Sequence, residues 1–408
     1  MRTVAFWLSL FMIFVIPWEN SIDIEGVGTV SRTIGLVVAV FWMATIIVTG
    51  KFRKPHSFHL AIYLFIVWNI ASTFWSFDVA ATLDRLQTYI QLLFMIFILW
   101  DLYNTPGDLR AGLQAYVLGA YVAFGSTFVN YLTGNEESFL RYAATGFNAN
   151  DLGPILALGI PIAWYLAITG GNNSKLANAL KVVNYAYIPA GILGILLSGT
   201  RGAMIAALPA IVFILSTLTR LRFRTRVMIF IALIGTLFAL QTVVPQYSIE
   251  RLATTGASIS ELDLDGRVNI WRQGIKVFSE HPLLGVGSSA FRTAVGIEKV
   301  AHNTFISVLV EVGIIGWVLF GIILAITFYQ AIHQPKLTAR FWLTVLLVWA
   351  LTASFMTWEQ RKQTWLILSL VIVSAGLSSP PVEAATQVIH HRQVPQVARK
   401  REENVYLE

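Results

Sequence analysis

Cysteine is absent from this chain and charged residues are scarce, and each absence excludes a class of protein. With no cysteine among its 408 residues, the chain has no disulfide, no catalytic thiolate and no cysteine-based metal site. Charged residues make up 12% of the chain and hydrophobic residues 56%, whereas about a quarter of an ordinary soluble domain is charged. This composition excludes a soluble globular fold.

Long apolar runs dominate the rest of the chain. Each extends over about 17 to 25 residues, which is the length that a helix needs to cross roughly 30 Å of hydrocarbon. The short alternating strands of membrane β-barrels give a different pattern. We therefore predict an all-α polytopic integral membrane protein with about twelve transmembrane helices. The expected spans are 4–18, 30–49, 57–76, 87–104, 111–132, 152–170, 180–198, 202–219, 227–245, 304–332, 340–357 and 364–377.

The basic residues predict an orientation. With the N-terminus in the cytoplasm, 17 lysines and arginines fall in cytoplasmic segments and six fall in short outer segments: Arg32, Arg85, Arg141, Arg201, Arg361 and Lys362. This is the positive-inside pattern of membrane proteins, and an even number of spans then places both termini in the cytoplasm. The first run is followed by Pro17-Trp18-Glu19 instead of a small-residue cleavage site, so we expect a retained span and not a signal peptide. The net charge of +7 fits a membrane surface better than nucleic acid.

The spacing of the runs divides the chain into four segments. Residues 1–245 contain nine expected helices with short loops, 246–303 form a large outer loop with short interfacial helices, 304–377 contain the last three helices, and 378–408 form a polar cytoplasmic tail that we expect to be disordered. Long loops in an otherwise economical chain usually carry function. Candidate site residues are therefore sought in the large loop and in the medium loop 133–151.

Arg201 lies in Ser198-Gly199-Thr200-Arg201-Gly202, a turn so short that the flanking spans must form a hairpin. Two interpretations of this outer arginine remain open. The guanidinium either extends to lipid phosphates at the interface or binds the phosphate oxygens of a substrate, for which its planar set of donors is suited.

Within the large loop, Asp265-Gly266-Arg267 precedes a stretch with helical periodicity that ends near His281-Pro282. Arg267, Trp271, Gly274 and Phe278 fall on one face of that helix, and an aromatic face of this kind favours a position along the membrane interface. Arg267 is then expected at headgroup depth. The alternative is a solvated arginine that only begins a helix.

The sequence Ala301-His302-Asn303-Thr304 begins the tenth expected span. A histidine at this position is suited to proton transfer, because its ordinary pKa of about 6.5 lies near working pH, and it is equally able to be a structural cap. Further along, Gly313 and Gly316 predict close helix packing. Glu311 lies about two and a half turns from His302, so we expect it on the opposite side of the helix.

Two further patterns compete with this outer site. Asp263-Leu264-Asp265 resembles the paired carboxylates that hold a divalent metal in sugar-nucleotide enzymes, although three residues are a weak signal and a solvated acidic turn is the better explanation. The loop 133–151 contains acids, amides and Arg141, which are able to hydrogen-bond a sugar but are also common in polar loops.

Taken in order, several motifs resemble the O-antigen ligase and polymerase superfamily of bacterial envelope glycan enzymes. They are RYAATGFNANDLG (141–153), SGTRG (198–202), the helix from Arg267 to Phe278, PLLGVG (282–287), and His302-Asn303 followed by Gly313 and Gly316. The last is the most specific, and the resemblance covers nearly the whole chain.

The resemblance implies a GT-C-like glycosyltransferase that needs no metal and no cofactor. Its donor would be O-antigen on undecaprenyl diphosphate, its acceptor the lipid A-core oligosaccharide, and its site the periplasmic face of the inner membrane. In that chemistry His302 is the expected general base, and Arg201 and Arg267 are expected to neutralise the leaving diphosphate. Expected substrate contacts are Arg141, Asn148, Lys299 and Asn303. Membrane lipids are partners and nucleic acid is not.

Two rival functions remain open. An O-antigen polymerase or a protein O-oligosaccharyltransferase of the same superfamily would use a similar donor, and the histidine to glycine spacing favours the ligase. A transporter or flippase would instead place its ionisable residues near the middle of the membrane in two matching halves. Here the informative residues gather at the outer surface, which favours an enzyme.

Overall fold

The computed structural model describes residues 1–24, 28–138, 140–171, 174–243, 250 and 266–378. Helices dominate these residues, and the strands among them are β1 (Asp23–Ile24) and β2 (Gly28–Thr29), which form one short antiparallel pair. The helices are α1 (Arg2–Val15), continued by the 3-10 helix η1 (Ile16–Ser21), α2 (Val30–Thr49), α3 (Ser57–Ala71), α4 (Val79–Leu102), α5 (Pro106–Leu132), α6 (Ala149–Thr169), α7 (Lys175–Ser198), α8 (Arg201–Thr217), α9 (Phe223–Val243), α11 (Arg267–Glu280), α12 (Phe291–Val295), α13 (Thr304–Ile332), α14 (Lys336–Phe355) and α15 (Lys362–Ser378).

Each of the twelve expected spans coincides with a helix. Among the described residues ten helices are long and apolar enough to cross a membrane, and α15 is a shorter apolar helix. The remaining span, 227–245, corresponds to α9. The prediction of an all-α polytopic membrane protein is thereby confirmed. Residues 379–408 lie outside the described residues. So do residues 246–249 and 251–265 of the large loop, which include Asp263 and Asp265.

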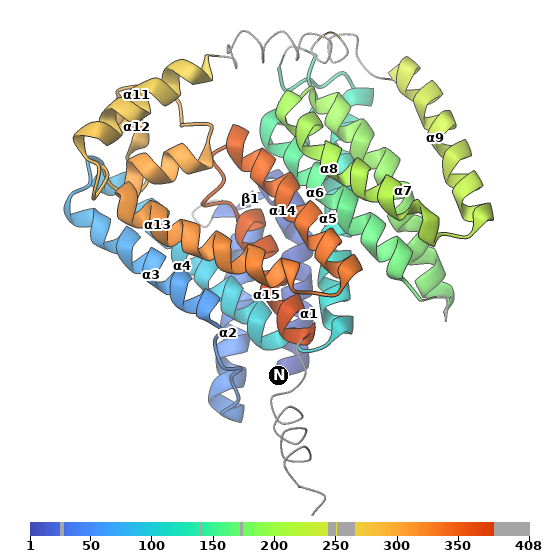
Figure 1. Cartoon of the computed structure of the whole chain (residues 1–408), viewed down its shortest axis with the longest axis horizontal. Coiled ribbons are helices and arrows are strands. Elements are labelled where there is room, and N and C mark those ends of the chain that lie inside the picture. Colours follow the sequence, from blue (N-terminus) through green and yellow to red (C-terminus); the bar gives the residue numbers. More distant parts are fainter. Residues whose placement is uncertain (25–27, 139, 172–173, 244–249, 251–265, 379–408) are drawn as a thin grey trace, which may run out of the picture.

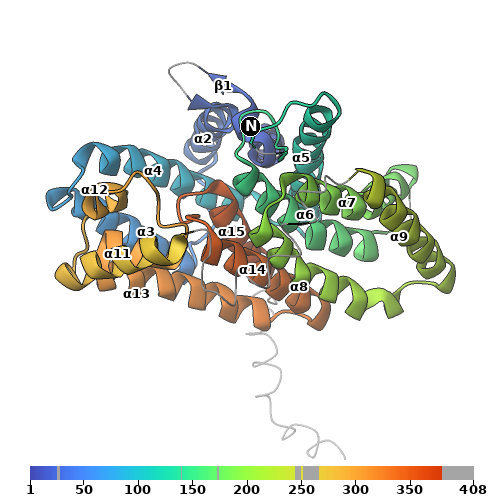
Figure 2. The same ribbon diagram turned by 90° about the horizontal axis from the view of Figure 1, so that it is seen from above.

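The helices α14 and α15 occupy the middle of the bundle. Figure 2 shows them between α3, α4 and α11–α13 on one side and α6–α9 on the other. In α15 every residue from Gln363 to Ala375 is buried, which is expected of a helix enclosed by protein and not by lipid. In Figure 1, α11 and α12 lie at the opposite end of the molecule from the N-terminus.

The start of α4 differs from the prediction. The helix begins at Val79 instead of residue 87, and the side chain of Asp78 caps it by accepting a hydrogen bond from the Ala81 amide at 3.0 Å. Arg85, which was expected in an outer connection, therefore lies inside the helix with its side chain 11% exposed. The sequence prediction left these residues out of the span because a charged side chain lowers the mean hydropathy. In the structure the charge of Arg85 is paired with Glu359.

A backbone crossing at Gly313 organises the outer half of α13. Gly313 has φ 66° and ψ −172°, which interrupts the helix. The segment 282–287 pairs with the opened backbone: the amides of Val286 and Gly287 donate to the carbonyls of Val310 and Glu311 at 3.1 and 2.8 Å, respectively. A Cβ atom added to Gly313 would lie 2.2 Å from the Leu283 carbonyl oxygen.

Gly313 and Gly316, the two glycines of the sequence pattern, thus make different kinds of contact. Gly316 packs closely against Trp68 of α3, as predicted, since an added Cβ would lie 3.0 Å from its ring. Gly313 was also expected to serve helix packing, but its close neighbour is the backbone of the segment 282–287. That segment approaches because the glycine has no Cβ and tolerates positive φ.

The substitution Gly313→Ala should destabilise the protein strongly. Positive φ alone costs roughly 1–3 kcal/mol for a residue with a side chain, and the clash with Leu283 adds to it. The matched control is Gly321→Ala on the same helix, where an added Cβ meets nothing within 4 Å. Thermal unfolding of the purified variants in detergent tests this. Equal melting temperatures for the two variants would refute the crossing.

Candidate functional site

The helix α11 is held against α12 and α13 by the face that the sequence predicted. Gly266 has φ 75° before the first residue, Arg267, and Ile270 and Gly274 are buried along the helix. A Cβ at Gly274 would lie 2.9 Å from the ring of Phe291. The aromatic and small residues of that face therefore pack on protein, and the position of the helix along the membrane interface stays a prediction. Periodicity identifies an apolar face but not what covers it.

Contacts on both sides of His302 fix its position. The indole nitrogen of Trp271 in α11 donates to the Ala301 carbonyl at 2.8 Å. Asn303 caps α13 by accepting from the Ile306 amide at 3.0 Å, and its amide nitrogen donates to the Ser354 carbonyl at 3.2 Å. His302 itself has φ 47°, an uncommon conformation for a residue with a side chain. Its Nδ1 atom is buried and has no hydrogen-bond partner among the described residues.

Charges from three segments surround the imidazole. Burial lowers the pKa of His302, and the positive charges of Arg267, Lys299 and Arg292 lower it further, whereas the carboxylate of Asp151 opposes them. Arg267 and Lys299 thus act electrostatically on His302, while their sharing one site stays a prediction. Asp151, at the end of the 133–151 loop, acts on His302 as well. A lowered pKa keeps the imidazole neutral near pH 7, the form that accepts a proton.

Arg141 joins the medium loop to the α7–α8 hairpin. Its Nε donates to the Ser198 carbonyl at 2.9 Å, and its Nη2 donates to the Asn150 side chain at 2.7 Å and to the Thr200 hydroxyl at 3.2 Å. The residue is 8% exposed. Through these contacts Arg141 positions the hairpin between α7 and α8.

Asn148 and Arg201 begin neighbouring helices. Asn148 caps α6 by accepting from the Asn150 amide at 2.8 Å and donates to Glu137 at 3.2 Å. Arg201 is the first residue of α8, and the next residue, Gly202, packs so closely on Phe355 that an added Cβ would lie 3.3 Å from its Cβ. The hairpin of Arg201 and the cap beside His302 thus both rest on the last residues of α14.

The connection between α14 and α15, residues 356–361, and the first residue of α15 supply charged contacts that sequence reasoning missed. Glu359 pairs with Arg85 at 2.6 Å, Arg361 pairs with Asp151 at 2.9 Å, and Lys362 contacts the carboxylate of Glu19. Arg85, Arg361 and Lys362, which the sequence assigned to short outer segments, are therefore ion-paired. The partners lie more than 200 positions apart in sequence, so local patterns carry no signal for them.

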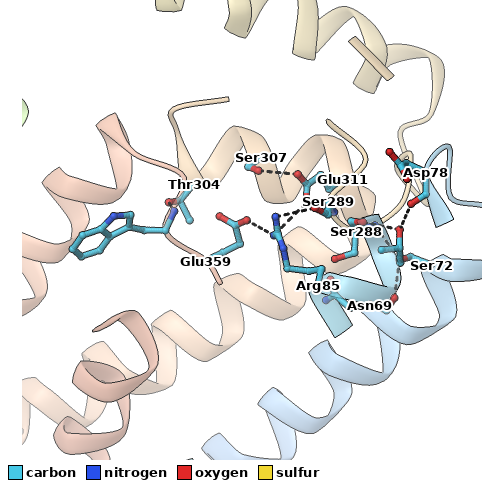
Figure 3. A network of polar contacts seen from close by, with 12 residues as sticks. Asn69, Ser72, Asp78, Arg85, Ser288, Ser289, Thr304, Ser307, Glu311 and Glu359 are labelled. Atoms are coloured by element: carbon cyan, nitrogen blue, oxygen red, sulfur yellow. Dashed lines mark hydrogen bonds and ion pairs between the residues drawn. The ribbon is translucent and has the colours of Figure 1, made fainter. Parts of the chain in front are cut away.

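Arg85 lies between two carboxylates, Glu359 and Glu311 (Figure 3). Glu311 is 3.7 Å from the guanidinium. It also accepts from the Ser289 amide at 2.7 Å and from the Ser307 hydroxyl at 3.2 Å. The acid thus faces the interior network, where it joins α13, α4 and the segment that follows Gly287.

Comparisons with known proteins add a family to this geometry. Residues 186–321 match the family model described as O-Antigen ligase. The chain is also 25% identical over 314 residues to the exopolysaccharide production protein ExoQ of Rhizobium meliloti (strain 1021). The aligned region covers 72% of this chain and 70% of that protein. Both matches support the resemblance to the O-antigen ligase and polymerase superfamily that the motifs indicated.

The segment matched to the O-antigen ligase model includes Arg201, Arg267 and His302. The loop of Arg141, Arg85 of α4 and residues 356–362 at the start of α15 and before it fall outside it. Members of this superfamily are glycosyltransferase-like ligases and polymerases, so the cluster around His302 is the candidate active site of an enzyme of that type.

A metal site is not apparent in the described part of the chain. None of the described histidines, aspartates and glutamates form a group of three that could hold a metal ion. The paired acids Asp263 and Asp265 lie outside the described residues.

The buried triad of Arg85, Glu311 and Glu359 should be costly to break. Arg85→Leu leaves two carboxylates without their cation, and removing one partner of a buried pair costs roughly 3–5 kcal/mol. We expect a large fall in melting temperature, which the double variant Arg85→Leu/Glu359→Leu partly reverses. Arg340→Leu, at an exposed position of α14, is the control. A melting temperature for Arg85→Leu equal to that of the control would contradict the role of the triad.

Proposed function

We propose that the protein is an O-antigen ligase, which transfers O-antigen polysaccharide from undecaprenyl diphosphate to the lipid A-core oligosaccharide. The observation that carries the proposal is His302, held between α11 and α14 with a lowered pKa and beside Arg267 and Lys299. A base next to several cations suits a reaction in which a hydroxyl loses its proton while a diphosphate departs. The O-Antigen ligase match over this segment supports it.

The reaction requires one bond to form and one to break. The acceptor hydroxyl attacks the anomeric carbon of the donor sugar, and its proton passes to the neutral imidazole of His302. The bond from that carbon to the diphosphate oxygen breaks, and the electron pair leaves with the diphosphate. Arg201 and Arg267 are proposed to bind the leaving group, because donors aimed at developing charge lower the barrier. Direct displacement inverts the anomeric centre.

The remaining predicted contacts divide according to their bonds in the fold. Lys299 is exposed and is proposed to meet the diphosphate or the sugar. Arg141, Asn148 and Asn303 are engaged in loop and cap contacts, so we propose that they act on the substrate mainly by positioning Arg201 and His302.

The location follows from the donor and from the charge distribution. We propose that the protein lies in the bacterial inner membrane with both termini in the cytoplasm and the His302 site on the periplasmic side. The excess of lysine and arginine in the segments assigned to the cytoplasm supports this orientation.

A polymerase is the second candidate, and one observation favours it. The relative ExoQ is named as an exopolysaccharide production protein, and a polymerase would use the same donor chemistry with a second lipid-linked glycan as acceptor. The two functions differ in the acceptor alone, so a reconstituted reaction separates them.

Purified protein in liposomes, supplied with lipid-linked O-antigen and lipid A-core, should give a ladder of ligated lipopolysaccharide, also in excess chelator. His302→Ala should lower the transfer rate by about 10²- to 10⁴-fold, the usual contribution of a general base, with an unchanged melting temperature. Elongation of the lipid-linked glycan without ligation would assign the polymerase instead. Ligation by His302→Ala at the wild-type rate would remove the histidine from the mechanism.

The pH profile of transfer gives an independent test. Since the neutral imidazole is the active form and its pKa lies below the ordinary 6.5, the rate should rise with pH with a midpoint below that value. Lys299→Gln removes a charge that lowers the pKa, so its acidic limb should move to higher pH. Asp151→Asn removes the opposing charge and should move the limb to lower pH. Identical midpoints in all three proteins would contradict the electrostatic assignment.

A further inference from the structure

The hydroxyl of Thr304, two residues after His302, joins the start of α13 to the connection between α14 and α15. It donates to the Met356 carbonyl at 2.8 Å and accepts from the Trp358 amide at 2.8 Å. Figure 3 shows Thr304 beside the segment that carries Glu359. Thr304 and Trp358 are 0% and 1% exposed, so both hydrogen bonds are shielded from water.

The first turn of α13 does not need this hydroxyl. Asn303 already caps the helix by accepting from the Ile306 amide at 3.0 Å. Both bonds of Thr304 leave the helix and reach residues 52 and 54 positions later in the chain. A threonine in a helix often bonds instead to a carbonyl of its own helix, as Thr327 does with Ile323 at 2.8 Å. The bonds of Thr304 therefore serve a contact between elements.

The connection is itself anchored, so it is able to act as a support. The Thr364 hydroxyl donates to the Trp358 carbonyl at 2.7 Å and accepts from the Trp349 indole at 2.9 Å. The two peptide groups that flank the side chain of Trp358 are therefore held, one by α15 and the other by Thr304. The ion pair of the next residue with Arg85 adds a contact with α4. The start of α13 is thus tied to a segment that three helices hold in place.

His302 lies between this tie and α11. The Trp271 indole holds the Ala301 carbonyl from α11, and Thr304 holds the chain on the other side. The backbone of His302 has φ 47°, a conformation that persists in a residue with a side chain only when its surroundings fix it. Loss of either anchor would therefore let the imidazole move.

The same connection also holds a carboxylate that acts on the imidazole. Arg361 pairs with Asp151 at 2.9 Å, and the negative charge of Asp151 opposes the lowering of the pKa of His302. Thr304 therefore ties the histidine to the element that fixes one of its neighbouring charges.

We propose that Thr304 is a positioning residue for the transfer reaction, which holds the imidazole of His302 in a fixed relation to the connection 356–361. The proposal rests on the proposed function, because a general base works only within hydrogen-bond reach of the proton that it takes. Since Thr304 is buried, it acts through the backbone of the residues before it. Its loss should slow the chemical step and leave substrate binding unchanged.

Thr304→Val, which removes the hydroxyl and keeps the shape, tests the proposal in the reconstituted assay, scored for ligation or elongation. Its kcat should fall about 10- to 100-fold, the effect of a displacement of about 1 Å, with an unchanged KM for the lipid-linked glycan. Thr304→Ser keeps the hydroxyl and should restore the rate. Thr327→Val, at an equally buried threonine bonded within α13, is the matched control. Equal kcat in Thr304→Val and this control would overturn the proposal.

A chemical measurement needs no substrate and separates this proposal from the proposed function. Diethyl pyrocarbonate modifies neutral imidazoles, and peptide mass spectrometry reports the rate at each histidine. His302 should react faster in Thr304→Val than in the wild type or Thr327→Val, whereas His281 should react alike in all three. Equal rates at His302 would overturn the positioning role.

A faster reaction at His302, combined with a wild-type protein that transfers no glycan, would support the positioning of His302 and reject the proposed function instead. Melting temperatures in detergent check that each variant is folded. If Thr304→Val does not fold, Thr304→Cys takes its place, because a thiol is a similarly small but weak donor. A wild-type kcat and a wild-type rate of modification in that variant would overturn the proposal.

Discussion

The pairing of charges at the connection between α14 and α15 is the constraint on which the rest of the structure depends. Glu359, Arg361 and Lys362 each contact an opposite charge on a different element: α4, α6 and η1. A buried charge such as that of Glu359 is tolerated only when it is paired. Because α15 is enclosed by the other helices, its first residues fix how the surrounding elements meet.

The backbone crossing of Gly285 and Gly313 adds a second constraint near the same place. It places the segment after α11 against the opened part of α13, where Glu311 joins Arg85 and the backbone of Ser289. The helix interruption is thereby satisfied by hydrogen bonds from the crossing segment, as a membrane environment requires. Together the ion pairs and the crossing hold α11 and the start of α13 in a fixed relation, with His302 between them.

This arrangement suits transfer from a charged lipid carrier. The imidazole lies among cations that lower its pKa, so the groups that would attract a diphosphate also keep the base neutral. The cap of α13 and the hairpin of Arg201 both rest on the end of α14. Residues from separate parts of the chain thus depend on one support, and movement of that support would affect His302 and Arg201 together.

The sequence by itself determined the class of fold and, apart from the start of α4, the positions of the long helices, and it supplied the proposal for the candidate site. These follow from local properties, namely the length of apolar runs, the helical period of α11 and the motifs around Arg201, Arg267 and His302. Their contacts with one another depend on how the helices pack, which a local pattern does not encode.

Only the tertiary structure decided the partners. Arg85 was placed in a loop because its charge interrupts an apolar run, and its helical position makes sense only with Glu359 in place, 274 positions away. The face of α11 was recognised, but its covering by Phe291 was not. Asp151 influences the pKa of His302 although the two residues are far apart in the chain. Gly313 interrupts α13 where the segment 282–287 crosses it. Long-range ion pairing and backbone crossing are properties of the packed bundle, and this is the physical reason that the sequence left them open.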